Sequence, residues 1–290
     1  ISSVMKYVKP ALMIGIAALI IWGVYFIVSR QGEAITPDRS TVSNTNSSEI
    51  ADAPQAPKPA FDTAALEQTL QTIANKYPSL DVGVSVRSAS QDTTTALQGE
   101  APFIAASTTK VIVAAYALNQ VQSGSIALDD YIGGRTLKEQ ITRMIVDSDN
   151  TAWYALLEHF GYRAITAFGN QQGAPSFDAV KNVVTPADMA LFIKNLHNGS
   201  IINSANVTFL EELMAQSNTG TISLNSEFSN LIRKAGWLSD RQHLVGVIIV
   251  NDTAVSYAIY TKSTGNGSYS YAKGSAFINE TLQAITAALQ

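Results

Sequence analysis

Apolar and polar positions follow two different periods along the chain. Val82, Val84 and Val86 alternate with polar or small residues, which is typical of a half-buried strand. Apolar runs bounded by turn residues indicate further strands downstream of residue 228. The strands predicted in this way lie at 82–86, 93–98, 229–237, 243–251 and 255–262.

Helical spacing covers most of the remaining sequence after residue 60. Residues 111–118, VIVAAYAL, are apolar on every side, which predicts a helix buried all round. The segment 185–188, TPAD, is typical of a helix start, and this helix is expected to end at Gly199. Ser204 is expected to cap the next helix. Other helices are predicted from apolar stripes at Leu66, Leu70, Ile73 and Tyr77; Leu137, Ile141, Met144 and Ile145; Trp153, Leu156, Leu157 and Phe160; and Ile278, Leu282, Ile285 and Leu289.

The order of these elements is helix, two strands, a block of helices, three strands and helix. It predicts an α+β domain in which both ends of the chain contribute to one sheet and the helical block is inserted between them.

The first sixty residues have a different character. Residues 11–28 carry no charge, and a helix of this length measures roughly 27 Å, close to the hydrocarbon thickness of a bilayer. Lys6 and Lys9 precede the segment, which favours an N-terminus inside and the rest of the chain outside. We expect an uncleaved signal anchor over residues 1–30 rather than a cleaved signal peptide, because the only small-x-small site, at 32–34, is poor.

Residues 31–60 hold four of the nine Pro residues and no aromatic residue. Such a segment buries too little apolar surface to offset its conformational entropy. It is therefore predicted to be a flexible linker, and the folded domain is predicted to occupy residues 61–290, outside the cytoplasm.

Composition excludes several kinds of chemistry. The net charge of −4 argues against nucleic-acid binding, which normally requires a basic face. The chain has no Cys, so a thiolate zinc site and a Cys nucleophile are excluded. The three His residues are scattered, which gives little support to a metal site or a Ser-His-Asp triad, and no cofactor or metal is expected.

The segment Ser107-Thr108-Thr109-Lys110 enters the predicted buried helix. Residues three apart share a helical face, so the amine of Lys110 can reach the hydroxyl of Ser107. A desolvated Lys with a lowered pKa can activate a Ser nucleophile, although an ordinary helix cap with a solvated Lys has the same pattern. The same spacing at Ser3/Lys6 and Ser270/Lys273 stands in less suitable positions.

Two further short motifs follow in the chain. Ser148-Asp149-Asn150 separates two predicted helices, and Lys234-Ala235-Gly236-Trp237 lies on a predicted strand. Each alone is compatible with an ordinary turn or strand end. The alternative KSTG at 262–265 is rejected because only one helix follows it, whereas two strands follow Lys234.

Together and in this order, the three motifs resemble those of penicillin-recognising serine enzymes, especially class A β-lactamases, whose set is S-x-x-K, S-D-N and K-T-G. PFIAASTTK, MIVDSDNTAWYALL and VTPADMALFIKNLHNG resemble longer family segments, and the likeness covers roughly 63–290. The fold that this implies is a five-stranded antiparallel sheet flanked by helices, with an all-helical lobe and an active site between the two.

The resemblance also implies roles for individual residues. Ser107 would be the acylated nucleophile, Lys110 its proton acceptor or relay, and Ser148 the group that passes a proton to the leaving nitrogen. Asn150 would orient Lys110 and the substrate amide, and Lys234 would support Ser148 and attract a substrate carboxylate. The backbone N–H groups of Ser107 and Trp237 would form the oxyanion hole.

Some positions depart from the family pattern. The resemblance implies that Ala235 and Gly236 bind substrate, but Ala235 replaces the Thr of K-T-G and lacks the hydroxyl that helps to bind a substrate carboxylate. Residues 165–184, where the family carries a Glu that activates water, contain no Glu. The nearest substitutes are Gln171 and Gln172, which can orient water but cannot take its proton, and Asp178. Hydrolysis of the acyl-enzyme is therefore expected to be slow.

The sequence thus predicts a membrane-anchored, extracytoplasmic serine hydrolase that acts on a β-lactam or a related amide bond. A D-alanyl-D-alanine carboxypeptidase or transpeptidase that acts on peptidoglycan-like peptides, or a non-catalytic binding module on this fold, are the alternatives. Two cations cannot comfortably share a low-dielectric cleft, so one of the two lysines, Lys110, is expected to have a depressed pKa.

Overall fold

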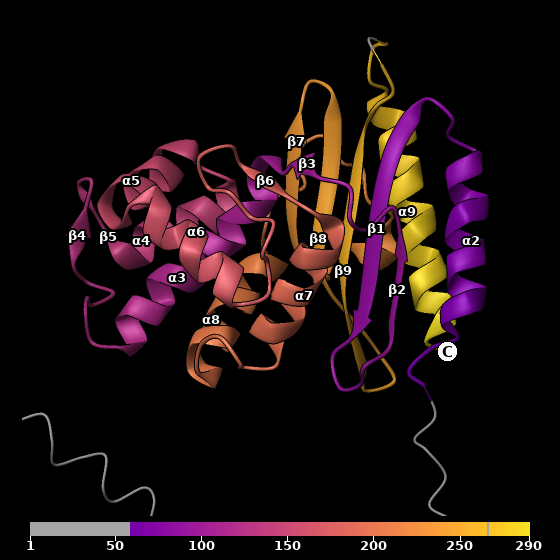
Figure 1. Cartoon of the computed structure of the whole chain (residues 1–290). Coiled ribbons are helices and arrows are strands. Elements are labelled where there is room, and N and C mark those ends of the chain that lie inside the picture. Colours follow the sequence, from indigo (N-terminus) through magenta and orange to yellow (C-terminus); the bar gives the residue numbers. More distant parts are fainter. Residues whose placement is uncertain (1–58, 266) are drawn as a thin grey trace, which may run out of the picture. The chain divides into compact units, whose positions relative to one another are not determined.

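The structure is a computed structural model that describes residues 59–265 and 267–290 (Figure 1). The predicted membrane segment at 11–28, and all but the last two residues of the predicted linker, lie outside these residues. Within the described ranges, no helix combines the length and apolarity that crossing a bilayer requires.

The five predicted strands form one antiparallel sheet in the order β2-β1-β9-β8-β7. The N-terminal β1 pairs with β9 over nine residues, from Leu80 opposite Ser263 to Ser88 opposite Val255. Segments from the two ends of the chain therefore lie side by side, as predicted (Figure 1). The strands are β1 (Leu80–Ser88), β2 (Thr94–Leu97), β7 (Ile232–Leu238), β8 (Arg241–Val250) and β9 (Thr253–Ser263).

Two helices, α2 (Thr63–Asn75) and α9 (Tyr271–Ala288), cover one face of this sheet (Figure 1). Their apolar stripes pack with the inner side chains of the sheet in one continuous hydrophobic cluster. Tyr77 lies just beyond α2, where its hydroxyl donates to Glu280 at 2.6 Å. The first and last predicted helices thus form one layer.

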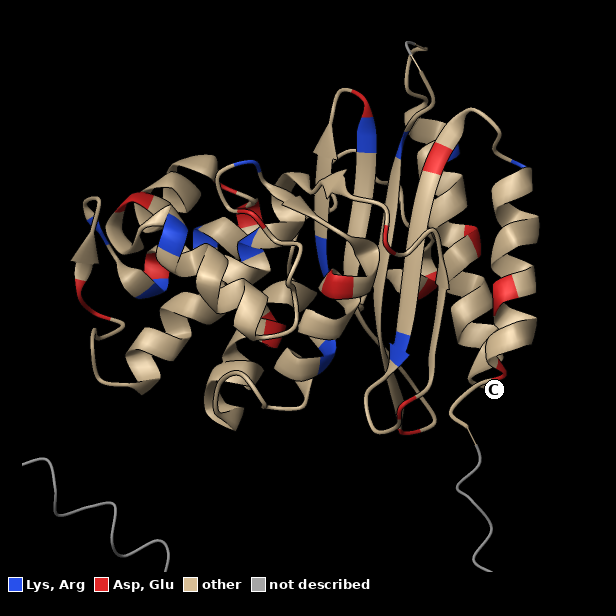
Figure 2. Ribbon diagram, viewed as in Figure 1, with Lys and Arg blue, Asp and Glu red and all other residues tan. Residues whose placement is uncertain are grey.

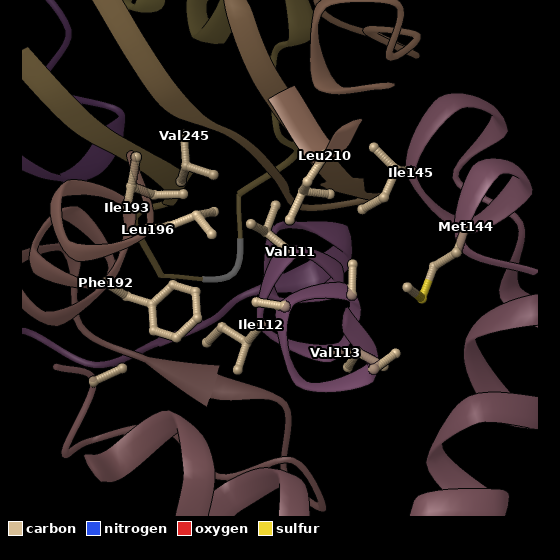
Figure 3. Close-up of a cluster of buried hydrophobic side chains, with 14 of the residues drawn as sticks. Val111, Ile112, Val113, Met144, Ile145, Phe192, Ile193, Leu196, Leu210 and Val245 are labelled. Carbon is tan, nitrogen blue, oxygen red and sulfur yellow. The ribbon is translucent and has the colours of Figure 1, made fainter. Parts of the chain in front are cut away.

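The other face of the sheet meets the helical lobe. At its centre is α3 (Lys110–Gln122), where Val111, Ile112 and Val113 point to successive sides of the helix and are at most 1% exposed (Figure 3). The prediction of a helix buried all round is therefore confirmed. The surrounding helices are α4 (Leu137–Thr142), α5 (Asn150–Phe160), α6 (Tyr162–Gln171), α7 (Pro186–His197) and α8 (Ser204–Ala215).

The predicted helix ends need small corrections. Thr185 caps α7 as expected, accepting a hydrogen bond from Asp188 N at 3.2 Å, but α7 ends at His197. The cap of α8 is Asn203, which accepts from Asn206 N at 3.0 Å, so the assignment of Ser204 as the cap is wrong by one residue. Asn is as effective a cap as Ser, and Ser204 becomes the first helical residue.

Two short strand pairs were not predicted, because two-residue strands leave no periodic signal. One joins β3 (Phe103–Ile104) to β6 (Val183–Val184), and the other joins β4 (Tyr131–Ile132) to β5 (Arg135–Thr136). The β3–β6 pair matters for the site, since it ties the segment before Ser107 to the segment before α7.

Candidate active site

Ser107 lies in a short 3₁₀ turn, Ala106–Thr109, that leads directly into α3. Ala106 has a left-handed backbone with a φ of 51°, which a residue with a side chain seldom adopts. The hydroxyl of Thr108 donates to Ala105 O at 2.8 Å and closes the turn. Ser107 is half-buried and lines a cavity, so this turn presents its hydroxyl-bearing residue to a hollow in the surface.

Lys110 is the first residue of α3, and only 1% of it is exposed. Its ammonium group donates to Ser148 O at 2.6 Å, to Asn150 Oδ1 at 2.7 Å and to Ser148 Oγ at 3.5 Å. Burial lowers the pKa of Lys110 to about 8, and the carboxylate of Asp149 opposes part of that shift. None of these hydrogen bonds reaches Ser107, although both residues line one cavity.

The Ser-Asp-Asn segment connects a π-helical turn, Arg143–Asp147, to α5. Ser148 has a left-handed backbone with φ 60° and ψ 31°. Asp149 caps α5 by accepting hydrogen bonds from its first-turn N–H groups, and it pairs with Arg143 at 3.0 Å. The middle residue therefore fixes the geometry of this connection, while Ser148 and Asn150 on either side of it contact Lys110.

Lys234 approaches the same serine from β7. Its side chain is fully buried, and its ammonium group donates to Ser148 Oγ at 3.1 Å, to Ala235 O at 3.1 Å and to Ser217 Oγ at 3.4 Å. Burial, and then the charge of Lys110, lower the pKa of Lys234 to about 7. The expectation of a depressed pKa at Lys110 is met, but Lys234 is lowered as well. Of the two lysines, Lys234 has the lower pKa.

The glycine of the third motif allows β7 to run beside the nucleophile. A Cβ atom on Gly236 would lie 2.9 Å from Ser107 N and 3.0 Å from Ala105 O, so the two backbones are closer than a side chain permits. Trp237 follows and lines the cavity, with its ring over Gly220. The backbone segments predicted to supply the oxyanion hole are therefore brought together.

Ala235 is not brought to the cavity. Side chains alternate along a strand, so when Lys234 and Gly236 face the helical lobe, Ala235 faces the opposite side of β7. It is fully buried in the cluster between the sheet and the flanking helices. The expectation that this side chain contacts substrate is therefore not supported by its position.

The cavity has a volume of about 370 Å³. It brings residues of three predicted motifs together with a group of aromatic and apolar side chains. Its lining consists of Ala106, Ser107, Lys110, Asn150, Trp153, Tyr154, Tyr162, Ala179, Val180, Asn182, Trp237 and Leu238.

The predicted water-orienting residues lie outside this lining. Gln171 ends α6, and Gln172 is the C-cap of that helix. The carboxylate of Asp178 accepts hydrogen bonds from Val180 N at 2.9 Å and Lys181 N at 3.0 Å. These N–H donors and the Lys181 side chain hold the pKa of Asp178 below its usual range, so the carboxylate is engaged within its own turn.

Asn182 contacts the nucleophile turn but was not predicted from the sequence. Its backbone O accepts from Ala105 N at 2.8 Å, its Nδ2 donates to Ala106 O at 2.8 Å, and its Oδ1 accepts from Thr109 Oγ1 at 2.6 Å. It therefore holds the nucleophile turn on both sides of Ser107. Its own left-handed backbone, with a φ of 52°, is one that Asn tolerates, but a single Asn gives no periodic signal.

The cavity lining offers few groups for carboxylate, histidine or metal-ion chemistry. Acidic and basic residues are dispersed over both lobes in Figure 2, and none of the Asp and Glu residues that the structure describes lines the cavity. None of the three His residues lines it either. Among the described residues, no three His, Asp or Glu side chains gather in a way that could hold a metal ion.

The sequence model described as "Beta-lactamase enzyme family" matches residues 65–289. A search of curated proteins gives no significant match. Many solved structures match.

Three of these structures illustrate the likeness. A mutant of PBP-A, solved as an acyl-enzyme complex with penicillin G, is 18% identical with a TM-score of 0.68, over 79% of this chain and 98% of that one. A beta-lactamase from Chitinophaga pinensis DSM 2588 is 18% identical with a TM-score of 0.68, over 78% of this chain and 100% of that one. A variant of the class A beta-lactamase of the last common ancestor of Gram-negative bacteria is 24% identical with a TM-score of 0.66, over 77% and 98%. At these identities the likeness is one of fold.

Proposed function

Because the chain belongs to the beta-lactamase enzyme family, we propose that it hydrolyses a β-lactam or a related amide bond through an acyl-enzyme on Ser107. The observation that supports this most is the position of Ser148 Oγ, 3.1 Å from Lys234 Nζ and 3.5 Å from Lys110 Nζ. A hydroxyl between two buried amines, beside a cavity lined by another serine, is suited to proton transfer.

Acylation begins with the neutral form of Lys110. This amine takes the proton of Ser107 as Oγ bonds to the substrate carbonyl carbon. Negative charge develops on the carbonyl oxygen, where the backbone N–H groups of Ser107 and Trp237 can donate to it. The close approach of β7 to the nucleophile turn supports this arrangement, since Gly236 leaves no side chain between them.

Collapse of the tetrahedral intermediate breaks the carbon–nitrogen bond. The leaving nitrogen receives a proton from Ser148, which recovers one from Lys110 or Lys234 through the contacts described above. Asn150 would orient the substrate amide. Its 2.7 Å contact with Lys110 and its place in the cavity lining support this role.

Release of the acyl group is the step for which the cavity is poorly equipped. It requires water and a base, and no carboxylate from the described part of the chain is among the lining residues. The same feature favours a second candidate, a D-alanyl-D-alanine carboxypeptidase or transpeptidase that penicillin traps. Both candidates share acylation of Ser107 and differ in the lifetime of the acyl-enzyme.

We also propose that the domain is held at the outer side of a membrane by residues 11–28. The support is the absence of charge over eighteen residues and the two lysines before them. Sedimentation of the full chain with membranes, and release of an intact domain by external protease, would test this placement.

A fluorescent penicillin tests the proposed activity directly. Labelling of the native chain, mapped by mass spectrometry to the peptide that contains Ser107 and lost in Ser107→Ala, is the expected result. Brief labelling indicates a hydrolase, and persistent labelling indicates the trapped peptidase. No labelling of a folded chain would favour the non-catalytic binding module.

A further inference from the structure

Large apolar side chains stand exposed around the cavity at Ser107. Val180 is 75% exposed, Tyr154 50% and Leu238 44%, and all three line the cavity. They come from the loop before β6, from α5 and from the end of β7, so the fold gathers them from separate segments. We name these three residues the apolar rim. Exposed apolar surface that rims a cavity commonly marks a binding site.

Aromatic rings extend this surface toward the catalytic lysine. The rings of Trp153 and Tyr154 lie 5.0 Å apart at an angle of 44°, and the Trp153 ring lies 5.6 Å from Lys110 Nζ. Tyr162 and Trp237 complete the lining. An apolar wall therefore runs from the proposed base to the rim.

The cavity offers less to a substrate carboxylate than to an apolar group. Among the residues that the structure describes, Lys110 is the one cation in its lining, and the ammonium group of Lys110 already donates to Ser148 O and Asn150 Oδ1. Ala235 points into the core, and Lys234 is fully buried. Arg241 pairs with Asp240, and Arg233 donates to three backbone carbonyls. Within the described part of the chain, no guanidinium group lines the cavity.

We propose that the substrate is selected by an aromatic or branched apolar group seated on the apolar rim, and that a carboxylate on the substrate contributes little. This inference rests on the proposed acylation of Ser107 and adds the class of acyl donor. The cavity volume of about 370 Å³ is within the range of small-molecule sites. An apolar group on the rim would lie next to the serine that reacts, because the rim and Ser107 line one cavity.

Three matched β-lactams test the inference. They are penicillin G, its analogue with methyl in place of benzyl, and the methyl ester of penicillin G. With the native chain, penicillin G is expected to acylate Ser107 at least about tenfold faster than the methyl analogue, because the ring buries more apolar area. The ester, which lacks the carboxylate, is expected to react within about threefold of the acid, since no guanidinium recognises that group.

Variants locate the preference on the rim. Tyr154→Ala and Val180→Ser are expected to reduce the benzyl-to-methyl ratio to about twofold, whereas Tyr154→Phe should keep it because the ring remains. Tyr131→Ala is the matched control, because Tyr131 is 76% exposed on β4 and does not line the cavity. Its ratio should equal that of the native chain.

The outcomes separate this inference from the proposed function. Equal rates for benzyl and methyl, or an acid that reacts far faster than its ester, would overturn the apolar selection and leave acylation of Ser107 standing. A chain that sediments with phosphatidylcholine vesicles only when Tyr154 and Val180 are intact, with an unchanged ratio, would show that the rim binds lipid instead. Failure of all three compounds to label Ser107 would refute the proposed function and this inference with it.

Discussion

Lys234 Nζ donates a 3.1 Å hydrogen bond to Ser148 Oγ from a position with no solvent exposure. Lys110 Nζ reaches the same oxygen at 3.5 Å, so two amines share one hydroxyl in a buried setting. Desolvation disfavours both charges, and the charge of Lys110 lowers the pKa of Lys234 further. The pair is therefore expected to give up its first proton between about pH 7 and 8.

The first prediction concerns the pH dependence of acylation. The proposed base must be neutral, and the pKa of Lys110 is about 8. The acylation rate should rise roughly tenfold per pH unit below that value and level off above it, with a midpoint about 2.5 units below the ordinary lysine value of 10.5. Stopped-flow acylation by a chromogenic cephalosporin from pH 5.5 to 9.5 measures this.

A matched pair of variants controls that measurement. Lys110→Ala should lose the pH-dependent limb, whereas Lys138→Ala should retain it, because Lys138 is exposed and does not line the cavity. A pH-independent rate in the native chain would exclude Lys110 as the proton acceptor.

The second prediction concerns stability. The pKa of Lys234 is about 7 in the folded state against 10.5 as its ordinary value, so folding weakens proton binding. This cost is complete below about pH 7 and shrinks as the pH rises toward 10.5. Lys234→Met removes it with a side chain of similar length, and should raise the free energy of unfolding by roughly 2 to 4 kcal/mol at pH 6.

Urea denaturation at pH 6 and pH 9.5 checks this expectation. The difference between the variant and the native chain should be smaller at the higher pH, while acylation of Ser107 is lost at both. Lys262→Met is the control, because Lys262 is partly exposed and pairs with Asp81 at the surface. A Lys234→Met chain that is less stable at pH 6 would contradict the desolvation argument.

The third prediction concerns Gly236. An added methyl would lie 2.9 Å from Ser107 N and 3.0 Å from Ala105 O, and these are backbone atoms that cannot swing away. Gly236→Ala should therefore displace β7 from the nucleophile turn and slow acylation by about a hundredfold or more, as loss of an oxyanion donor does.

Gly267→Ala provides the matched control for this change. Among the described residues, only Thr264 O would lie within 4 Å of an added Cβ there, at 3.8 Å. Circular dichroism should show both variants folded, and the acylation rate should fall only in Gly236→Ala. Unimpaired acylation in Gly236→Ala would mean that the close approach is not needed for the reaction.

The sequence predicted the parts of the site that depend on local spacing. Ser107 and Lys110 are three residues apart at the start of one helix, and the uninterrupted apolar run after them could only be buried. Contacts that depend on which face of a strand a side chain occupies, or on the course of a loop, could not be predicted from local spacing. Ala235 was expected in the site, but the alternation along β7 turns it into the core.

The segment between α6 and α7 shows the same limit. Asp178 was singled out for its charge, yet its carboxylate is satisfied by neighbouring N–H groups of its own turn. Asn182 instead reaches the nucleophile turn, because the β3–β6 pair brings two distant segments together. A strand pair of only two residues on each side leaves no periodic pattern in the sequence. The contact of Asn182 with the nucleophile turn could therefore be found only in the tertiary structure.

The last prediction concerns release of the acyl group. Acylation has a nucleophile, two perturbed amines and a bridging hydroxyl, whereas no carboxylate of residues 59–265 and 267–290 lines the cavity to activate water. General base catalysis commonly contributes about 10²- to 10⁴-fold, so deacylation should be the slow step. With excess substrate, product should appear in a rapid burst of about one equivalent per chain, followed by a slow steady rate, and Ser107→Ala should show no burst.

Asp178→Asn discriminates between explanations of that slow rate. The carboxylate of Asp178 accepts from Val180 N and Lys181 N and pairs with Lys181 Nζ at 3.2 Å, so it is not free to take a proton from water. Its pKa also lies below the usual range, which makes it a weak base. The burst and the steady rate should therefore be the same in Asp178→Asn as in the native chain. If the steady rate instead falls in this variant, the loop must open in the acyl-enzyme and bring Asp178 to the water. If steady turnover is fast and survives the substitution, the base comes from another part of the chain, and the slow-release proposal fails.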